Sequence, residues 1–342
     1  MSMMEFLREI TAVPGTSGYE SPVAQAFYEA FAPFADEISI DPMGSVVAVQ
    51  RGTGAGPRLL LTAHIDEVGL MTTDVEEDGS VRFMPMGVAA MMLPAQEVTL
   101  LTREGPLYGV VGADKTEEED KAVCAQALFI DTGLPAAEVR RLVPLGTPVQ
   151  LSGPLTALEN GRVAGKTLDD RACCAILLQC ARELHRMTHD AEVVYLLAVR
   201  EEFDGLGAAA GAERIRPDLA VALDVTHGTM EGCEAGETFP MDASTLAVGP
   251  NLHRGLTALL KAQAQRLHVK TMPEVCAGHT GTDAWAIQIA CEGIPCALLS
   301  LPVKYMHTTV ELASQEVMAQ QAHLLAQTAA ALDARWEELV CS

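Results

Sequence analysis

The chain has 342 residues, of which 49% are hydrophobic, 20% charged and 4% aromatic, enough for one large domain and a smaller one. Its formal net charge of −23 repels nucleic acid and anionic membranes, which excludes both as expected partners. The nine cysteines show no metal-finger spacing and predict free thiols in a reducing compartment. We expect neither a leader nor a membrane-spanning segment, and therefore a cytoplasmic protein.

Short apolar runs alternate with helix-like segments over most of the chain. Helical patterns at 4–13 and from Ser21-Pro22 onward come first, and alternating strand patterns follow at 37–50. Buried strands that alternate with helices predict an α/β sandwich. The expected buried strands are 58–63, 193–199, 219–223 and 296–301, and the expected helices are 170–186, 206–215, 256–267, 283–291 and 310–339.

Residues from about 73 to about 160 break this rhythm. They hold short alternating strands, such as 81–83 and 107–111, and show little helical period. We therefore expect a small β-rich domain at 73–160, inserted into an α/β domain formed by 1–72 and 161–342. The charge run at 114–121 is expected to be a solvated loop.

Two pairs of ligand-type residues follow buried strands. His64 and Asp66 are two residues apart and point the same way, so that the imidazole could take a metal while the carboxylate orients it. A hydrogen-bonded histidine at a strand end is the alternative. Glu201 and Glu202 end another strand, where paired carboxylates are costly without nearby positive charge. One could bind a metal while the other takes a proton from activated water.

Three further positions extend this pattern. Asp169 and Asp170 precede an apolar helix, where carboxylates also serve as caps. Asp224 ends a strand, with turn formation as the alternative, and His307 lies just past the strand at 296–301. His227 is expected in a site wall or at the surface. Sites in α/β sheets form at the carboxyl ends of strands, and mixed nitrogen and oxygen ligands fit a zinc-type centre.

The order of these motifs resembles the glutamyl and deblocking aminopeptidase family, the tetrahedral aminopeptidases, some of whose members carry endoglucanase names. The resemblance covers nearly the whole chain, from Pro14 to Glu311. Its motifs are Pro14-Gly15-x-Ser17-Gly18-x-Glu20, His64-x-Asp66-Glu67, Tyr108-Gly109-Val110-Val111-Gly112, Gly165-Lys166-x-x-Asp169-Asp170-Arg171, Glu201-Glu202, Asp224, Gly281-Thr282-Asp283-Ala284, Gly293-Ile294-Pro295, Tyr305-Met306-His307-Thr308 and Val310-Glu311.

The resemblance implies a catalytic domain with a mixed α/β/α sheet and an inserted β-barrel-like domain used for oligomerisation. It implies a homo-oligomer, from a dimer up to a tetrahedral dodecamer. The implied activity is that of a metallo-aminopeptidase that hydrolyses N-terminal residues from peptides. Two divalent metal ions per subunit are implied, zinc or cobalt, with manganese as a further candidate.

The resemblance also implies roles for single residues. The metal ligands would be His64, Asp169, Glu202, Asp224 and His307, with Asp169 bridging the two ions. The remaining two residues would act in catalysis, Asp66 by orienting His64 and Glu201 as the general base.

The sequence departs from the family pattern at two places, and three alternative functions stay open. His279 and Thr280 stand where the family tends to glycine, and the loop at 113–123 is more acidic than in the family. A two-metal deacylase or carboxypeptidase would need a cationic grip on its substrate from Arg254, Lys270 or Lys304. A glycosidase would use the paired carboxylates but leaves the two histidines unexplained. A non-catalytic assembly protein would need no general base.

Overall fold

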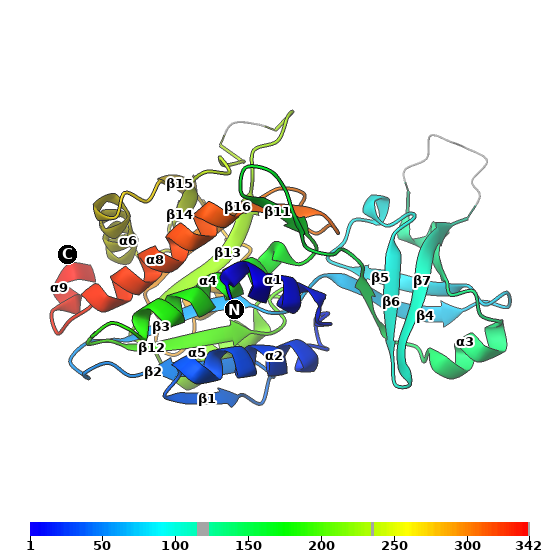
Figure 1. Cartoon of the computed structure of the whole chain (residues 1–342), viewed down its shortest axis with the longest axis horizontal. Helices are drawn as coiled ribbons and strands as arrows, with labels where there is room; N and C mark the ends of the chain where they lie inside the picture. The colour runs from blue at the N-terminus through cyan, green and yellow to red at the C-terminus, as the bar shows by residue number, and fades with distance from the viewer. Residues whose placement is uncertain (115–122, 234–235, 341–342) are drawn as a thin grey trace.

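The computed structural model describes residues 1–114, 123–233 and 236–340, which form an α/β body with a β-barrel beside it (Figure 1). The expected solvated loop at 114–121 falls almost wholly outside the described residues. None of the helices within those residues is both long and apolar enough to cross a membrane.

The body is built on a mixed eight-stranded sheet in the order β1-β2-β12-β3-β13-β16-β14-β15. The four strands β12, β3, β13 and β16 run parallel, whereas β2 and β14 join them antiparallel. This confirms the predicted mixed α/β fold. The strands are β1 (Glu37–Ile40), β2 (Val46–Gln50), β3 (Arg58–His64), β12 (Glu192–Ala198), β13 (Leu219–His227), β14 (Ser244–Val248), β15 (Thr271–Val275) and β16 (Cys296–Val303).

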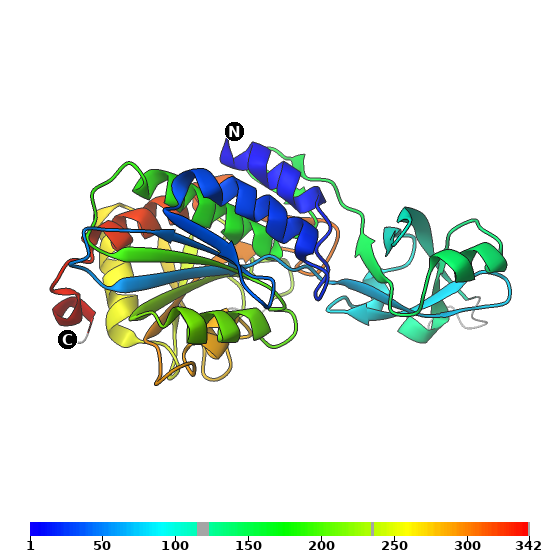
Figure 2. The same ribbon diagram turned by 90° about the horizontal axis from the view of Figure 1, so that it is seen from below.

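Helices cover both faces of this sheet (Figure 2). Alternate residues of β12 supply the two cores, with Val193 and Tyr195 on one face and Val194 and Leu196 on the other. Strands buried on both faces read as continuous apolar runs, which is why the sequence indicated them. The first face carries α1 (Met3–Ala12), α2 (Ser21–Phe31), α4 (Leu168–Leu184), α6 (Arg254–Arg266), α8 (Gln315–Ala331) and the C-terminal α9 (Trp336–Val340), and the second carries α5 (Leu206–Ile215) and α7 (Asp283–Ile287).

The inserted part is a closed antiparallel barrel in the order β4-β5-β8-β7-β6-β9. Its core includes Leu70, Leu100, Ile130 and Val149, and α3 (Ala136–Leu142) packs against it through Val139. The range 73–160 begins inside β4 and reaches beyond β9, and its limits as a domain stay a prediction. The barrel strands are β4 (Gly69–Val75), β5 (Val81–Met86), β6 (Glu97–Thr102), β7 (Gly105–Ala113), β8 (Leu128–Asp131) and β9 (Pro148–Leu151).

A three-stranded sheet packs against the body through Val163 and Ala313 and corrects one prediction. Its strands are β10 (Thr156–Ala157), β11 (Arg162–Gly165) and β17 (Glu311–Ser314). The prediction of continuous helix over 310–339 was wrong for β17, because these residues pair with β11, and such distant pairing leaves no local signal. The predicted helix at 283–291 likewise ends early, at Ile287. The short 3₁₀ helices are η1 (Ala32–Phe34), η2 (Ala90–Met92) and η3 (Ala125–Ala127).

Candidate metal centre and active site

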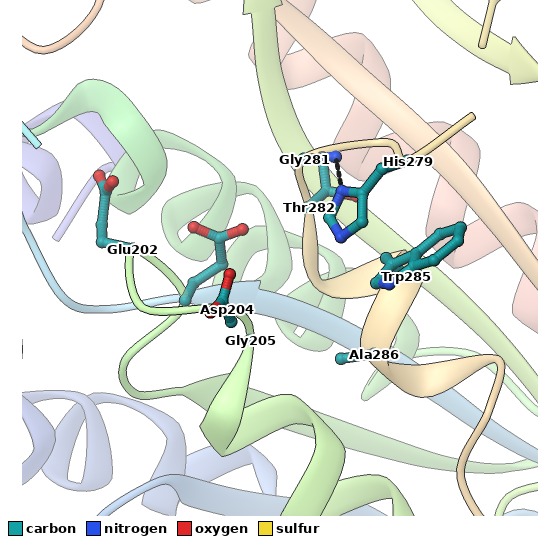
Figure 3. A pocket seen from close by; sticks show the side chains of 9 residues that line it. Glu202, Asp204, Gly205, His279, Gly281, Thr282, Trp285 and Ala286 are labelled. Atoms are coloured by element: carbon teal, nitrogen blue, oxygen red, sulfur yellow. Dashed lines mark hydrogen bonds between the residues drawn. The ribbon is translucent and has the colours of Figure 1, made fainter. Parts of the chain in front are cut away.

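Two cavities lie beside the carboxyl ends of β12 and β13. The smaller, about 190 Å³, lies between the turn after β12 and the segment that carries His279 and Trp285 (Figure 3). The rings of His279 and Trp285 lie against each other at a tilt of 39°, with centroids 4.4 Å apart. The larger, about 280 Å³, shares Glu201 and Glu202 with the first. Both glutamates therefore stand between two spaces that could hold the two sides of a substrate. His279, which lines the smaller cavity, and Thr280, which lines the larger, are the two residues that stand where the family tends to glycine.

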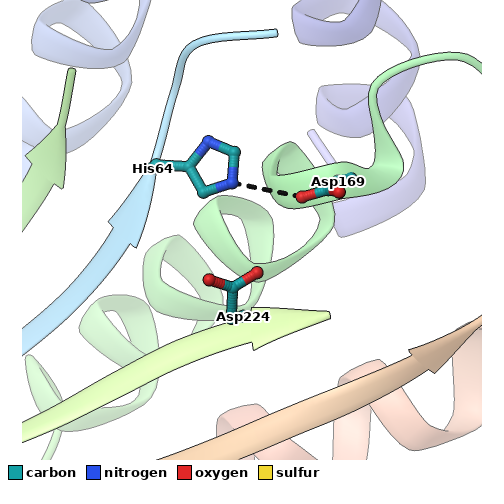
Figure 4. A group of neighbouring side chains, drawn as sticks. All are labelled: His64, Asp169 and Asp224. Carbon is teal, nitrogen blue, oxygen red and sulfur yellow. Dashed lines mark hydrogen bonds and ion pairs between the residues drawn. The ribbon is translucent and has the colours of Figure 1, made fainter. Parts of the chain in front are cut away.

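His64, Asp169 and Asp224 form one group able to hold a metal ion (Figure 4). His64 ends β3 and Asp224 lies near the end of β13, two parallel neighbours, while Asp169 is in the first turn of α4. One ligand atom from each lies within 4.8 Å of the others, and His64 Nε2 is 3.1 Å from Asp169 Oδ1. The convergence expected at the strand ends therefore occurs.

Asp169, Glu202 and His307 form a second such group. His307 Nε2 lies 3.1 Å from Asp169 Oδ2 and 3.4 Å from Glu202 Oε1. The two carboxylate oxygens of Asp169 thus face two different histidines, His64 and His307. Asp169 is the residue that the two groups share.

The histidines are oriented by backbone carbonyls. His307 Nδ1 lies 2.8 Å from the oxygen of Gly87, which follows the barrel strand β5, and His64 Nδ1 lies 3.2 Å from the oxygen of Asp66. A carbonyl can only accept, so each Nδ1 donates a proton to it. Burial lowers the pKa of both imidazoles, but the contacts with Asp169 outweigh it and raise the pKa of His64 and, to about 9, that of His307, so a cation would displace a proton from each Nε2. Both Nε2 atoms point into the groups described above, which is the arrangement that metal-binding histidines need.

Asp66 connects His64 to the turn that carries both glutamates. Its Oδ1 accepts from the backbone N–H of Glu201 at 3.0 Å, and its Oδ2 accepts from the hydroxyl of Ser17 at 2.6 Å. Oδ1 also lies 3.4 Å from His64 Nδ1. Since Asp66 is fully buried, these contacts hold the ends of β3 and β12 in a fixed relation.

Buried carboxyl groups crowd this site. Burial, opposed only in part by His64, raises the pKa of Glu201 to about 9, and burial together with Asp169 raises the pKa of Glu202 to about 7. Burial also raises the pKa of Asp224 well above its usual range. Glu202 Oε1 has no hydrogen-bond donor among the described residues. Divalent cations would satisfy these groups in place of protons, so the donor set fits a metal centre.

The sequence analysis assigned no role to three residues of this site, although Glu311 is part of a motif of the resemblance. Glu311 accepts from the backbone N–H groups of Asp169 at 3.0 Å and His307 at 2.8 Å, but its strand was taken for helix. Glu274 and Ser300 line the larger cavity. Glu274 lies on β15, for which no strand was predicted, and a lone serine in an apolar strand gives no signal. His227, expected in a wall or at the surface, is exposed and lines this cavity.

Glu67, next to Asp66, is the centre of a buried network. Burial alone would raise its pKa, but the charges of Lys166 and Arg171 lower it. The network joins Glu67 to the loop before α2, to the last barrel strand and to the start of α4. It therefore holds the segment of His64 and Asp66, which precedes Glu67, against the start of α4, which carries Asp169. Its Oε1 accepts from Gly15 N at 3.1 Å, Gln150 Nε2 at 3.0 Å and Arg171 Nη2 at 3.3 Å, and its Oε2 accepts from Thr167 Oγ1 at 2.8 Å and from Lys166 Nζ.

Replacing Glu67 by Gln is expected to lower the free energy of unfolding by about 3–5 kcal/mol. The change leaves the charges of Lys166 and Arg171 buried without their carboxylate. Denaturant unfolding of the variant and the parent protein measures the difference. The control is Glu104→Gln, which breaks an exposed pair with Arg141 and should cost less than about 1 kcal/mol. Equal effects of the two changes would contradict the prediction.

A mixed sheet that gathers histidines and carboxylates around a shared aspartate fits the class of metal-dependent hydrolases. The sequence model of the M42 glutamyl aminopeptidase family matches residues 44–324, and the chain belongs to this family of metallopeptidases. It is therefore an aminopeptidase, an enzyme that acts on peptides.

Known relatives match along almost the whole chain. A lysyl aminopeptidase of Pyrococcus furiosus is 31% identical over 90% of this chain and 91% of its own length. The structure of an aminopeptidase from Desulfurococcus kamchatkensis superposes with a TM-score of 0.93 at 27% identity, covering 99% of this chain and 98% of that chain. The Pyrococcus horikoshii TET1 peptidase, described as able to assemble into a tetrahedron or a large octahedral shell, gives a TM-score of 0.85 at 26% identity, covering 97% of this chain and 100% of that chain.

Proposed function

We propose that the enzyme is a two-metal aminopeptidase in which Asp169 binds both divalent cations. His64 and Asp224 complete the ligands of one cation, and Glu202 and His307 those of the other. The observation that carries the proposal is the position of Asp169, whose Oδ1 and Oδ2 each lie 3.1 Å from the Nε2 atom of a different histidine. The mixed donor set suits zinc or cobalt, with manganese as a further candidate.

Two bound cations would polarise the scissile carbonyl and lower the pKa of a water molecule. We assign the proton transfer to Glu201, which lines both cavities and whose carboxylate lies 3.8 Å from His64 Nε2. The Glu201 carboxylate takes the proton of the attacking water and then delivers it to the leaving amine. Asp66 acts as a positioning residue, because it holds both His64 and the backbone of Glu201.

The deacylase or carboxypeptidase alternative needs a cationic grip on a substrate carboxylate. Among the described residues that line the two cavities, none is Lys or Arg. Lys270, one of the residues considered for that grip, pairs instead with Asp242 at 2.8 Å. This favours a substrate that offers a free amine to the acidic site.

We also propose that the enzyme is a homo-oligomer that uses the domain at 73–160 for assembly. The barrel exposes large apolar side chains, including Met84, Tyr108 and Val110, which a partner subunit could cover. The TET1 relative, described as assembling into closed shells, supports this. A cytoplasmic location fits the cysteines, since every cysteine that the structure describes is free.

Hydrolysis of aminoacyl p-nitroanilides tests the function directly. Chelated protein is expected to be inactive, and added zinc, cobalt or manganese should restore cleavage of substrates with a free amine. N-acetylated substrates serve as the control and should not be cleaved, because the free N-terminus is part of the recognition. Cleavage that survives complete chelation would refute the two-metal assignment, and cleavage of acetylated substrates would refute the exopeptidase.

A further inference from the structure

Glu274 lies in the wall of the larger cavity and belongs to neither metal-binding group. It belongs to β15, the last strand of the sheet, and its side chain is partly buried. Its Oε1 accepts from the hydroxyl of Thr226 at 2.7 Å, and its Oε2 accepts from the hydroxyl of Thr245 at 2.6 Å. Hydroxyls from two other strands thus hold the carboxylate in place, while each of its oxygens keeps a lone pair for a ligand.

No cation of the described chain balances this carboxylate. The ion pairs found among the described residues do not include Glu274, and the cavity lining contains no Lys or Arg within that part of the chain. Its two histidines are His307, which belongs to a metal-binding group, and the exposed His227. A carboxylate left unpaired in a binding cavity favours a cationic ligand group and disfavours an anionic one.

Ser300 supplies a second, independent indication of a ligand. Its side chain is only 1% exposed and lines the same cavity, yet within the described residues its Oγ has no hydrogen-bond partner. In the sheet, Ser300 is the register partner of Asp224 on β13 and of Thr245 on β14. An unsatisfied hydroxyl therefore lies between the metal-binding end of the cavity and the residue that holds Glu274. Buried polar groups of this kind are normally paired.

The spacing suits a long side chain. Thr226, which contacts the Glu274 carboxylate, is two residues beyond Asp224 on β13, a distance of about 6.6 Å along the strand. A short side chain that starts near the metal-binding group cannot span this distance. A lysine stem of about four carbons, or the similar stem of arginine, can. A leucine would leave Glu274 unpaired, and a glutamate would place a second carboxylate against it.

We propose that Glu274 is a specificity-determining residue that makes the enzyme prefer peptides with an N-terminal lysine or arginine. The cationic head, an ammonium with three donors or a guanidinium with five, donates hydrogen bonds to the Glu274 carboxylate and to Ser300 Oγ. This inference rests on the proposed function, because the same cavity must accept the first residue of the peptide.

The test compares p-nitroanilides of lysine, arginine, leucine and glutamate on the metal-loaded enzyme. The parent protein should show the highest kcat/KM for lysine and arginine and the lowest for glutamate. In Glu274→Gln the lysine-to-leucine ratio of kcat/KM should fall by about ten- to a hundredfold, because the amide lacks the negative charge and keeps only one acceptor oxygen. The control Glu292→Gln, which removes the same charge from an exposed residue outside both cavities, should leave the ratio unchanged. A parent preference for glutamate, or an unchanged ratio in Glu274→Gln, would overturn the assignment.

A second measurement needs no variant. Calorimetry on the metal-loaded parent protein compares L-lysine with L-norleucine, which has the same four-carbon stem but lacks the terminal amine. Binding of lysine at least about tenfold tighter would support the role of Glu274, and equal affinities would refute it. The two measurements separate the proposed aminopeptidase function from the proposed specificity. If no p-nitroanilide is cleaved, the function is contradicted, whereas the difference in binding between lysine and norleucine still tests the specificity.

Discussion

Replacing Glu201 by Gln is expected to lower kcat by about 10²- to 10⁴-fold while the metal content stays at the parent level. The amide keeps the size of the side chain but cannot accept the proton of the attacking water. Glu201 also lies outside both groups of residues able to hold an ion. Steady-state kinetics together with metal analysis by mass spectrometry measures the two effects on one preparation.

The neighbouring residue provides a matched control for this variant. Glu202→Gln makes the same chemical change one residue later, but Glu202 belongs to a metal-binding group with Asp169 and His307. This variant is therefore expected to lose metal as well as activity. If Glu201→Gln lost metal and Glu202→Gln kept it, the roles of base and ligand would have to be exchanged.

Replacing Asp169 by Asn is expected to remove both ions and to lower kcat/KM by at least about a thousandfold. Both groups able to hold an ion contain Asp169, and an amide nitrogen has no lone pair for a metal. Losing the ions would cost several kcal/mol of transition-state stabilisation. Titration of the chelated protein with zinc, followed by calorimetry, counts the sites that remain.

Variants that affect one group each make this result interpretable. Asp224→Asn and His307→Ala each belong to a single group and should each weaken one site while the other still binds. Circular dichroism confirms that every variant is folded. Retention of one complete site in Asp169→Asn would contradict the expected loss of both ions.

Much of the site could be predicted because its residues follow strands with clear local patterns. His64, Glu201, Glu202 and Asp224 each lie at or near the end of a buried apolar run, and parallel strands bring such ends to one edge. The ligand roles themselves came from the resemblance and stay proposals. A β-rich insertion was visible as a loss of helical period, because alternating strands leave a pattern of their own, and its barrel form was implied by the resemblance.

Other parts of the site had no local pattern. The role of Glu311 could not be predicted, although a motif contains it, because its strand pairs only with a distant partner. Gly87 orients His307 through a backbone carbonyl, which no residue type reveals. Glu274 is fixed by Thr226 and Thr245 from two other strands. Each of these contacts joins segments that are far apart in the chain.

The sequence by itself determined the mixed α/β class, the inserted barrel and the family to which the enzyme belongs. These follow from hydrophobic periodicity and from motifs that are read over a few neighbouring residues. Only the tertiary structure decided that Asp169 stands between His64 and His307, that Glu67 holds the surrounding segments and that Glu274 faces the cavity. The physical reason is that hydrogen bonds and charge pairs act over a few ångströms in space, whatever the separation of their residues along the chain.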